Sequence, residues 1–132
     1  MKALLDTHIL LWWHCDREML SQDQWNVITA ADAETPLQVS DISLWEVATL
    51  HSLGRIRLTI PLREWLEKAV APPLVRRHGI SPAVATELAS LPASFHRDPA
   101  DRILVATART IGATLLTRDR RISAAKLVDT LA

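Results

Sequence analysis

Cysteine is almost absent from the sequence, and long apolar runs are missing altogether. The chain has 132 residues and a single cysteine, Cys15. One thiol excludes an intrachain disulfide framework and suits a reducing compartment. No apolar run approaches the roughly 20 residues needed to cross a bilayer. Asp6 interrupts the first apolar run, so the N-terminus does not resemble a signal peptide. We therefore expect a cytoplasmic protein that makes no membrane contact.

The sequence also lacks an excess of charge of either sign. Fifteen Lys and Arg residues balance fifteen Asp and Glu residues, so the formal net charge is +0. This balance gives no global attraction to nucleic acid or membrane. No Cys/His cluster indicates zinc, because the five histidines lack a familiar ligand spacing. With 48% apolar residues, we expect residues 1–132 to form one compact domain with a real core.

Short apolar runs alternate with stretches of helical periodicity along the chain. We predict strands at 2–6, 37–41, 74–80 and 113–119, and a short last strand in the tail. We predict helices at 8–15, 21–34, 43–53, 61–70, 81–91 and 98–112. This alternation is typical of an α/β domain with a mostly parallel sheet. In such sheets ligands bind at the carboxyl ends of the strands.

Two acids stand at the ends of predicted strands. Asp6 ends the first apolar run, and Asp119 ends the last clear one. If both runs are parallel strands, both carboxylates lie at the same edge of the sheet. The plainer alternative is that each aspartate only begins a turn or caps the next helix, which aspartate does well.

Glu46 lies within a predicted helix. Ile42, Leu50 and Leu53 stand four residues before it and four and seven after it, which predicts a shared face. A glutamate on an inward face must be neutralised, paired or bound to metal, because an unpaired buried charge is too costly. A buried ion pair with arginine, or a helix rotated so that Glu46 lies at its edge, would explain the same pattern.

The stretch "FHRDPADRILVATA" opens the clearest predicted helix. Asp98, the proline after it and Asp101 three residues later predict a capping box. Asp101 also shares a face with Leu104 and Val105, at offsets of three and four. We therefore expect Asp101 to point along the buried side of the helix. Capping alone explains where the helix begins, but it does not explain why Asp101 shares the apolar face of the helix.

The four acids are thus predicted to converge at one edge of the sheet. Close carboxylates repel one another and raise each other's pKa values unless a cation is present. Hard divalent ions such as Mg²⁺ and Mn²⁺ prefer oxygen ligands. A carboxylate-held Mg²⁺ site commonly serves phosphoryl chemistry. The sequence therefore predicts a divalent metal site for this chemistry at Asp6, Glu46, Asp101 and Asp119.

Arginines flank these acids along the chain. Such side chains are suited to contacting phosphates beside the site. A solvated surface with ion pairs is the plainer alternative. Arg121 adjoins the same acids. Our candidates for phosphate contacts are Arg97, Arg102, Arg118 and Arg120.

These pieces together resemble the PIN-domain nucleases, in particular the VapC-like toxins of bacterial toxin–antitoxin pairs. The matching stretches are "LLDTHILLW", "SDISLWEVATL", "FHRDPADRILVATA" and "LLTRD", in this order between Ala3 and about Ile122. Each stretch alone is a weak indication of the family, but all four stretches in this order in so short a chain are quite specific for it. The resemblance implies a single PIN-like domain, an α/β/α sandwich with a mostly parallel central sheet. It also implies RNA cleavage by water that Mg²⁺ or Mn²⁺ activates.

The resemblance also implies roles for individual residues. Asp98 matches an auxiliary acid, and three polar positions that support the ligands are matched by Thr7, Ser43 and Thr117. Ala100 stands where relatives often carry a bulky apolar residue, a difference that concerns local packing. The positions of catalytic metal ligands are matched by Asp6, Glu46, Asp101 and Asp119.

Partners are implied in the same way. A toxin of this kind would form a homodimer and be held inactive by a cognate antitoxin, which covers an apolar groove and places a basic residue into the acidic site. Tryptophan is enriched in such contacts, and the candidate anchors are Trp12, Trp13, Trp45 and Trp65. Core packing is the alternative, and we favour it for Trp45 and Trp65.

Three other interpretations stay open. The chain fits a PIN nuclease without an antitoxin, acting in RNA maturation or on DNA. It also fits a catalytically idle PIN-like binding module, which a metal titration would reveal. A receiver-like or phosphatase-like domain needs an N-terminal acidic pair and a lysine at a late strand end. This chain has one acid in "LLDTH" and ends its late strand in "TRD", which makes that class the weakest of the three.

Overall fold

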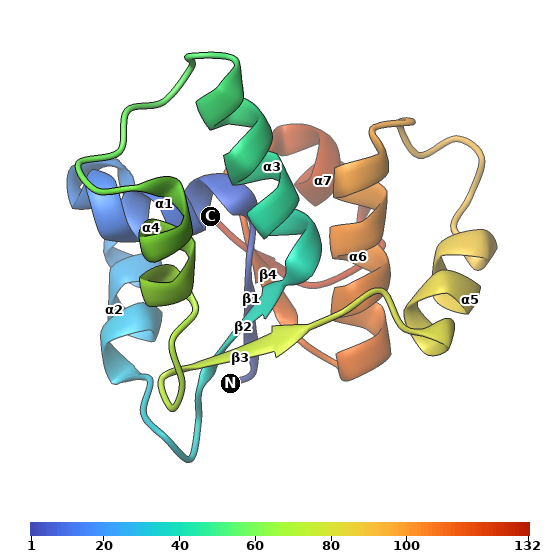
Figure 1. Cartoon of the computed structure of the whole chain (residues 1–132). Helices are drawn as coiled ribbons and strands as arrows, with labels where there is room; N and C mark the ends of the chain where they lie inside the picture. Colours follow the sequence, from blue (N-terminus) through green and yellow to red (C-terminus); the bar gives the residue numbers. More distant parts are fainter.

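Five strands form one sheet at the centre of the molecule, and helices cover both of its faces (Figure 1). The computed structural model describes all 132 residues, Met1–Ala132. The strands are β1 (Ala3–Leu5), β2 (Leu37–Ser40), β3 (Val75–His78), β4 (Thr114–Leu116) and β5 (Thr130–Leu131). Their order is β3-β2-β1-β4-β5, and every neighbouring pair is parallel. The predicted α/β class, with a parallel sheet, is confirmed.

Seven α-helices and one short 3-10 helix connect the strands. They are α1 (Thr7–Cys15), η1 (Arg17–Met19), α2 (Gln22–Ala30), α3 (Asp41–Ser52), α4 (Leu62–Ala69), α5 (Pro82–Ser90), α6 (Pro99–Ile111) and α7 (Arg120–Ala125). The sequence predicted six of these. It missed η1 and α7, because three and six residues are too few to show a helical period. None of the helices has the length and apolar character that a bilayer-spanning segment requires.

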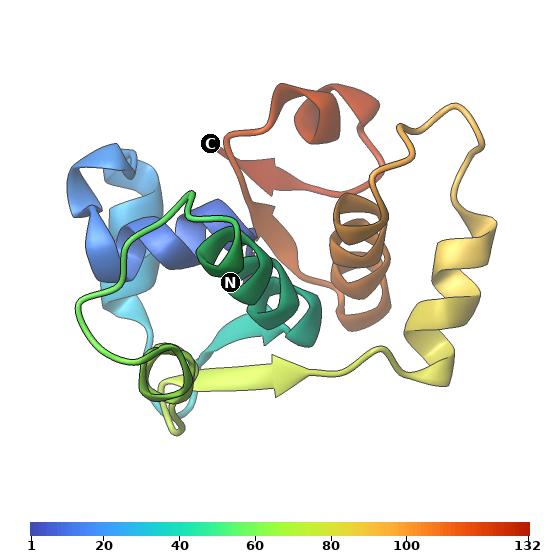
Figure 2. The ribbon, with the colours of Figure 1, turned by 45° about the horizontal axis from the view of Figure 1, so that its top comes forward.

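The sheet separates two hydrophobic cores, which makes the predicted α/β/α sandwich. Helices α1 to α4 pack against one face, and α5, α6 and α7 pack against the other. Figure 2 shows α1, α2 and α4 on one side of the strands and α5 and α6 on the opposite side. In β1, Ala3 and Leu5 belong to the first core and Leu4 to the second. This alternation follows from the two-residue period of a strand, so a strand of only three residues serves both cores.

Three strand ends meet at the edge where the site is expected. β1 lies between β2 and β4, and all three run in the same direction. The backbone N–H of Asp6 donates to the carbonyl of Leu116 at 3.0 Å, which extends the β1–β4 ladder to the end of both strands. Residues that directly follow these strands, and the first turns of the helices after them, therefore gather at one edge.

Two helices near the site are capped by the residue directly before them. Asp6 caps α1, since its carboxylate accepts the Thr7 N–H at 2.6 Å. Ser40 caps α3, because its hydroxyl accepts an N–H of the first turn at 3.2 Å. As a result, the hydroxyl groups of Thr7 and Ser43 are available for other partners.

The tryptophans divide between core and surface. Trp13 and Trp65 are buried in the first core, as predicted for Trp65. The prediction that Trp45 packs in the core is wrong, because its side chain is 60% exposed. The buried face of α3 runs through Ser43 and Val47, and residue 45 lies on the opposite side of the helix.

Candidate active site

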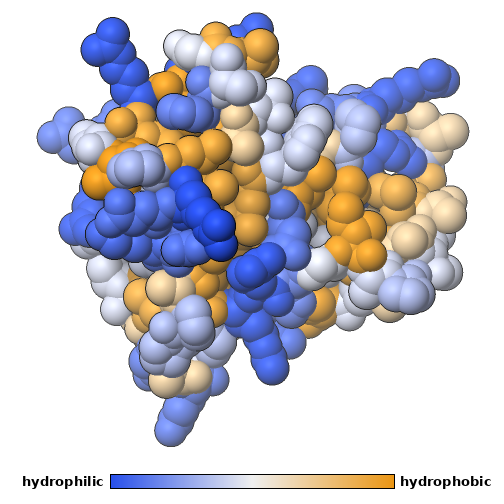
Figure 3. All heavy atoms as spheres, in the orientation of Figure 1, coloured by the Kyte–Doolittle hydropathy of each residue, from blue (hydrophilic) through white to orange (hydrophobic).

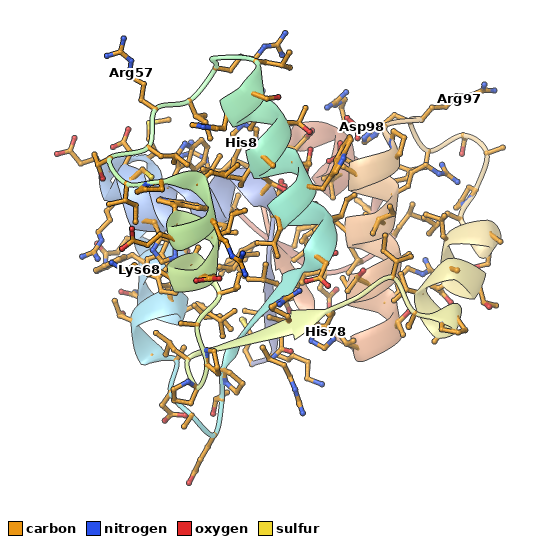
Figure 4. All side chains as sticks on the ribbon, in the orientation of Figure 1. His8, Arg57, Lys68, His78, Arg97 and Asp98 are labelled. Atoms are coloured by element: carbon orange, nitrogen blue, oxygen red, sulfur yellow. The ribbon has the colours of Figure 1, made fainter.

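An acidic cavity opens at the carboxyl edge of the sheet. Its volume is about 300 Å³, and five acids and two arginines line it with a histidine and a tryptophan. The lining residues are Asp6, His8, Trp12, Glu46, Asp98, Asp101, Arg118, Asp119 and Arg121. Figure 4 shows Asp98 at the start of α6, on the side that faces α3. The structure thus brings the four acids predicted as ligands around one cavity, although 113 positions separate the first from the last.

Asp6 is buried directly after β1. Its Oδ1 accepts the Thr7 N–H at 2.6 Å, and its Oδ2 accepts the hydroxyl of Thr117 at 2.7 Å. Burial raises the pKa of Asp6 above its usual value, the hydrogen bond from Thr117 opposes this rise, and the charge of Asp101 adds to it. An ionised carboxylate in such a place gains from a nearby cation.

Glu46 is half-buried on α3 and faces α1. The Thr7 hydroxyl donates to Oε1 of Glu46, and it also forms a 2.9 Å hydrogen bond with the hydroxyl of Ser43. Burial raises the pKa of Glu46, Thr7 counteracts this through its hydrogen bond, and the charge of Asp6 adds to the rise. Thr7, Ser43 and Thr117, predicted as supporting residues, therefore contact the predicted ligands or one another.

The predicted shared face around Glu46 is only partly present. Leu53 is 60% exposed, and the inward face of α3 passes through Ser43 and Val47. Glu46 lies at the border of this inward face, where it reaches the cavity. The structure therefore matches the rotated-helix alternative. Residue spacing gave the relative positions on the helix but did not fix its rotation about its axis.

Asp98 and Asp101 have different partners. Oδ1 of Asp98 accepts the N–H groups of Ala100 at 3.0 Å and Asp101 at 3.3 Å. The Asp98 side chain therefore forms its half of the predicted capping box. The other half, from the Asp101 side chain back to the cap, is absent, because Oδ2 of Asp101 accepts a 2.7 Å hydrogen bond from Nε2 of His96. Burial raises the pKa of Asp101, the hydrogen bond from His96 lowers it, and the charge of Asp98 raises it further. Asp98 thus begins the helix, whereas Asp101 lines the cavity.

His96 is a site residue that the sequence did not reveal. It stands five positions before Asp101, in the loop that leads into α6, and its side chain is only 20% exposed. No spacing rule predicts the contact, because it depends on the loop folding back over the first turn of the helix. The only signal was its place in the same short stretch as the two aspartates.

Asp119 is the one acid of the predicted four whose pKa is lowered. The guanidinium of Arg121 causes this shift, with Nη2 at 3.0 Å from Oδ2 and Nε at 3.3 Å from Oδ1 of Asp119. The same Nη2 lies 3.7 Å from Oδ2 of Asp101. Asp119 also caps α7 by accepting the Arg121 N–H at 2.9 Å. Arg121 therefore connects two of the predicted ligands.

The predicted phosphate contacts take different positions. Arg118 lines the cavity, and its Nη1 donates to a backbone carbonyl of η1 at 2.8 Å. Arg102 instead donates to the Phe95 carbonyl at 3.2 Å and lies over the Phe95 ring. Arg97 extends away from the cavity (Figure 4), and Arg120 does not line it. Arg118 is thus the member of this set that the fold brings to the acids.

Carboxylate oxygens are the main donor atoms of the cavity. Such a set suits a hard divalent cation and offers no thiolate for a softer one. As the side chains lie, no three His, Cys, Asp or Glu residues form a ready-made group for a metal ion. The carboxylates are directed toward separate partners: Thr117, Thr7, His96 and Arg121. Repulsion among the acids favours this spread arrangement, and a cation would favour their convergence.

Sequence comparisons with known proteins cover nearly the whole chain. The family model of the PIN domain matches residues 3–127. The chain is 42% identical over 120 residues to Ribonuclease VapC22 of Mycobacterium tuberculosis. That alignment covers 91% of this chain and 88% of the mycobacterial protein.

Solved structures share the fold at lower identity. VapBC2 from Rickettsia felis, bound to a DNA fragment from their promoter, has a TM-score of 0.74 at 14% identity, and 99% of this chain and 98% of that chain are covered. FitAcB from Neisseria gonorrhoeae has a TM-score of 0.70 at 20% identity, with 98% and 96% covered. A toxin–antitoxin complex from Klebsiella pneumoniae has a TM-score of 0.67 at 18% identity, with 99% and 97% covered.

Proposed function

The chain belongs to the PIN-domain family, and on this premise we propose that it is a metal-dependent endoribonuclease that hydrolyses RNA phosphodiester bonds. The observation that carries the proposal is the arrangement of Asp6, Glu46, Asp101 and Asp119 around one cavity. The name of the mycobacterial relative supports RNA as the substrate. We further propose that residues 1–132 form a single PIN domain that acts in the cytoplasm.

The four acids would hold one or two Mg²⁺ or Mn²⁺ ions, with Asp98 as an auxiliary acid. Such an ion, when bound, lowers the pKa of water and stabilises negative charge on a phosphate. Thr117 donates a hydrogen bond to Asp6, and Thr7 donates one to Glu46. These hydrogen bonds restrict the rotation of the two carboxylates. The chain's own contribution is therefore to hold these two carboxylates at the edge of the cavity through hydrogen bonds.

Arg118 is the side chain best placed to bind the RNA backbone beside the acids. One of its N–H groups donates to a carbonyl of η1, which leaves the other guanidinium donors available. A guanidinium presents five N–H donors in a planar fork that matches phosphate oxygens. We propose that Arg118 positions an RNA phosphate at the mouth of the cavity.

We also propose that the protein is the toxin of a toxin–antitoxin pair and forms a homodimer. The structure from Klebsiella pneumoniae is described as a toxin–antitoxin complex, which supports a protein inhibitor here. Five acids and only two arginines line the cavity, so a basic side chain of an antitoxin would fit it by charge. Trp45 and Ile80 are exposed, and with Ile42 they line a pocket at the start of α3 that is a candidate for contact with a partner. Figure 3 shows hydrophobic atoms exposed on this face of the molecule.

The nuclease proposal is tested with fluorescently labelled single-stranded RNA and a DNA of the same sequence. We expect RNA cleavage with Mg²⁺ or Mn²⁺ and none after EDTA treatment. Preferential cleavage of the DNA, or cleavage that EDTA leaves unchanged, would contradict the proposal. Failure to bind Mn²⁺ would favour the idle binding module.

The toxin proposal is tested separately by expressing the chain with and without the small protein encoded beside its gene. We expect growth arrest when the chain is expressed alone and recovery when the partner is present. Equal growth in both cultures would count against a toxin, while cleavage in the previous assay would still support a nuclease of RNA processing.

A further inference from the structure

Arg121 supplies a positive charge inside the acidic cavity. Its guanidinium forms two contacts with Asp119, through Nη2 at 3.0 Å and Nε at 3.3 Å. The same Nη2 lies 3.7 Å from Oδ2 of Asp101. The cation therefore lies between carboxylates from two separate elements, the first turn of α6 and the connection from β4 to α7.

This position conflicts with joint binding of a metal by the same two acids. Mg²⁺ binds oxygens at about 2.0–2.1 Å and demands near-octahedral geometry. Both carboxylate oxygens of Asp119 are engaged by the guanidinium of Arg121, and the contacted oxygen of Asp101 also accepts the hydrogen bond from His96. A divalent ion that bridges Oδ2 of Asp101 and Oδ2 of Asp119 would have to take the place of Nη2 of Arg121, which contacts both of these oxygens.

The contacts of Arg121 with both Asp119 and Asp101 differ from an ordinary surface ion pair. An exposed pair contributes little to stability, and Arg121 with Asp119 alone would be such a pair. However, the side chain of Asp101 is only 11% exposed, and burial raises its pKa. The Arg121 side chain itself is 63% exposed, so it can rotate into solvent without opening the core. The contact is therefore one that a bound cation is able to replace.

We propose that Arg121 is an internal counter-cation that competes with the divalent metal for Asp101 and Asp119 and thereby lowers the metal affinity of the free protein. This inference rests on the proposed function, because it takes these acids to be metal ligands. It adds a regulatory contact within the chain itself. Metal binding then requires exchange of one cation for another at the same carboxylates.

Isothermal titration of Mn²⁺ into the metal-free, full-length protein tests the competition directly. Arg121→Gln removes the guanidinium, and we expect it to tighten Mn²⁺ binding about fivefold or more. Arg121→Lys keeps the charge but loses the planar fork, so its affinity is expected between those of the wild type and the glutamine variant. Thermal unfolding gives a second readout, since Mn²⁺ should raise the Tm of Arg121→Gln more than that of the wild type.

Arg120→Gln is the matched control, because it removes the same charge from the same turn of α7 at a side chain outside the cavity. We expect its Mn²⁺ affinity to stay close to that of the wild type. Unchanged or weaker Mn²⁺ binding by Arg121→Gln would overturn the proposed role of Arg121 but not the metal site. Equal tightening of Mn²⁺ binding in both glutamine variants would have the same meaning. Absence of Mn²⁺ binding in all the proteins would overturn the metal site and this inference together.

Discussion

The hydroxyl of Thr117 donates a 2.7 Å hydrogen bond to Oδ2 of Asp6, across 111 positions of the chain. Thr117 follows β4 and Asp6 follows β1, so the pairing of these two parallel strands creates the contact. Thr117 is buried and also accepts the backbone N–H of Asp119 at 3.0 Å. A single hydroxyl thus connects the first and the last of the predicted ligands.

Thr117→Val should destabilise the protein by about 1–3 kcal/mol, because the substitution leaves a buried carboxylate oxygen and a backbone N–H without their partner. Thr117→Ser keeps the hydroxyl and should therefore lose much less stability than Thr117→Val. Urea unfolding at neutral pH measures both variants. Equal stability of Thr117→Val and the wild type would show that the hydrogen bond does not support the site.

Asp6→Asn should raise the stability of the metal-free protein at neutral pH. Burial raises the pKa of Asp6 above 3.8, so the folded chain holds this proton to a higher pH than the unfolded chain does. Between 3.8 and the raised value the folded state binds more protons, and stability therefore falls as pH rises. Asparagine has no such charge and still caps a helix well.

Thermal unfolding in EDTA from pH 4 to pH 7.5 measures this difference. The Tm gain of Asp6→Asn should increase with pH across this range. A gain that does not depend on pH, or a loss at neutral pH, would show that the carboxylate is not under electrostatic strain.

His96→Ala should weaken Mn²⁺ binding by about 10–100-fold, as loss of an outer hydrogen-bond partner of a ligand typically does. His96 donates to Asp101 and so fixes its orientation. His8→Ala is a suitable control, because His8 lines the same cavity but forms no hydrogen bond with an acid. Equal effects of the two substitutions on Mn²⁺ affinity would remove the positioning role of His96.

Trp45→Ala should change the stability by less than about 0.5 kcal/mol, since an exposed side chain loses few contacts. Trp65→Ala, in the core, should cost about 3–5 kcal/mol. If the exposed surface around Trp45 binds a second copy, light scattering should show that Trp45→Ala weakens the dimer. An unaltered dimer would place that contact elsewhere on the molecule.

The strand ends explain which parts of the site could be predicted. Asp6 and Asp119 end apolar runs, and parallel pairing then places them at one edge whatever the details of packing. The helix start at Asp98 was equally clear, since an aspartate and a proline precede an apolar period. These features depend on local chemistry that the sequence displays. The catalytic roles of these acids stay predictions.

Other parts depend on tertiary packing and could not be predicted. The spacing around Glu46 gave its neighbours on α3 but not the rotation of that helix, which packing of Val47 in the first core sets. The contacts of His96 and Arg121 arise from a loop and a six-residue helix, neither of which has a period to recognise. Sequence patterns therefore did not reveal the contacts of these two side chains with Oδ2 of Asp101.

RNA cleavage by Asp6→Asn, measured in single turnover across a Mn²⁺ titration, tests the central claim most directly. Asp16→Asn is the matched control, because Asp16 is an exposed acid outside the cavity. Circular dichroism should first show that both variants keep the wild-type fold. We predict that Asp6→Asn reduces cleavage to background at every Mn²⁺ concentration, whereas Asp16→Asn cleaves like the wild type. Undiminished cleavage by folded Asp6→Asn would contradict the assignment of this cavity as the active site.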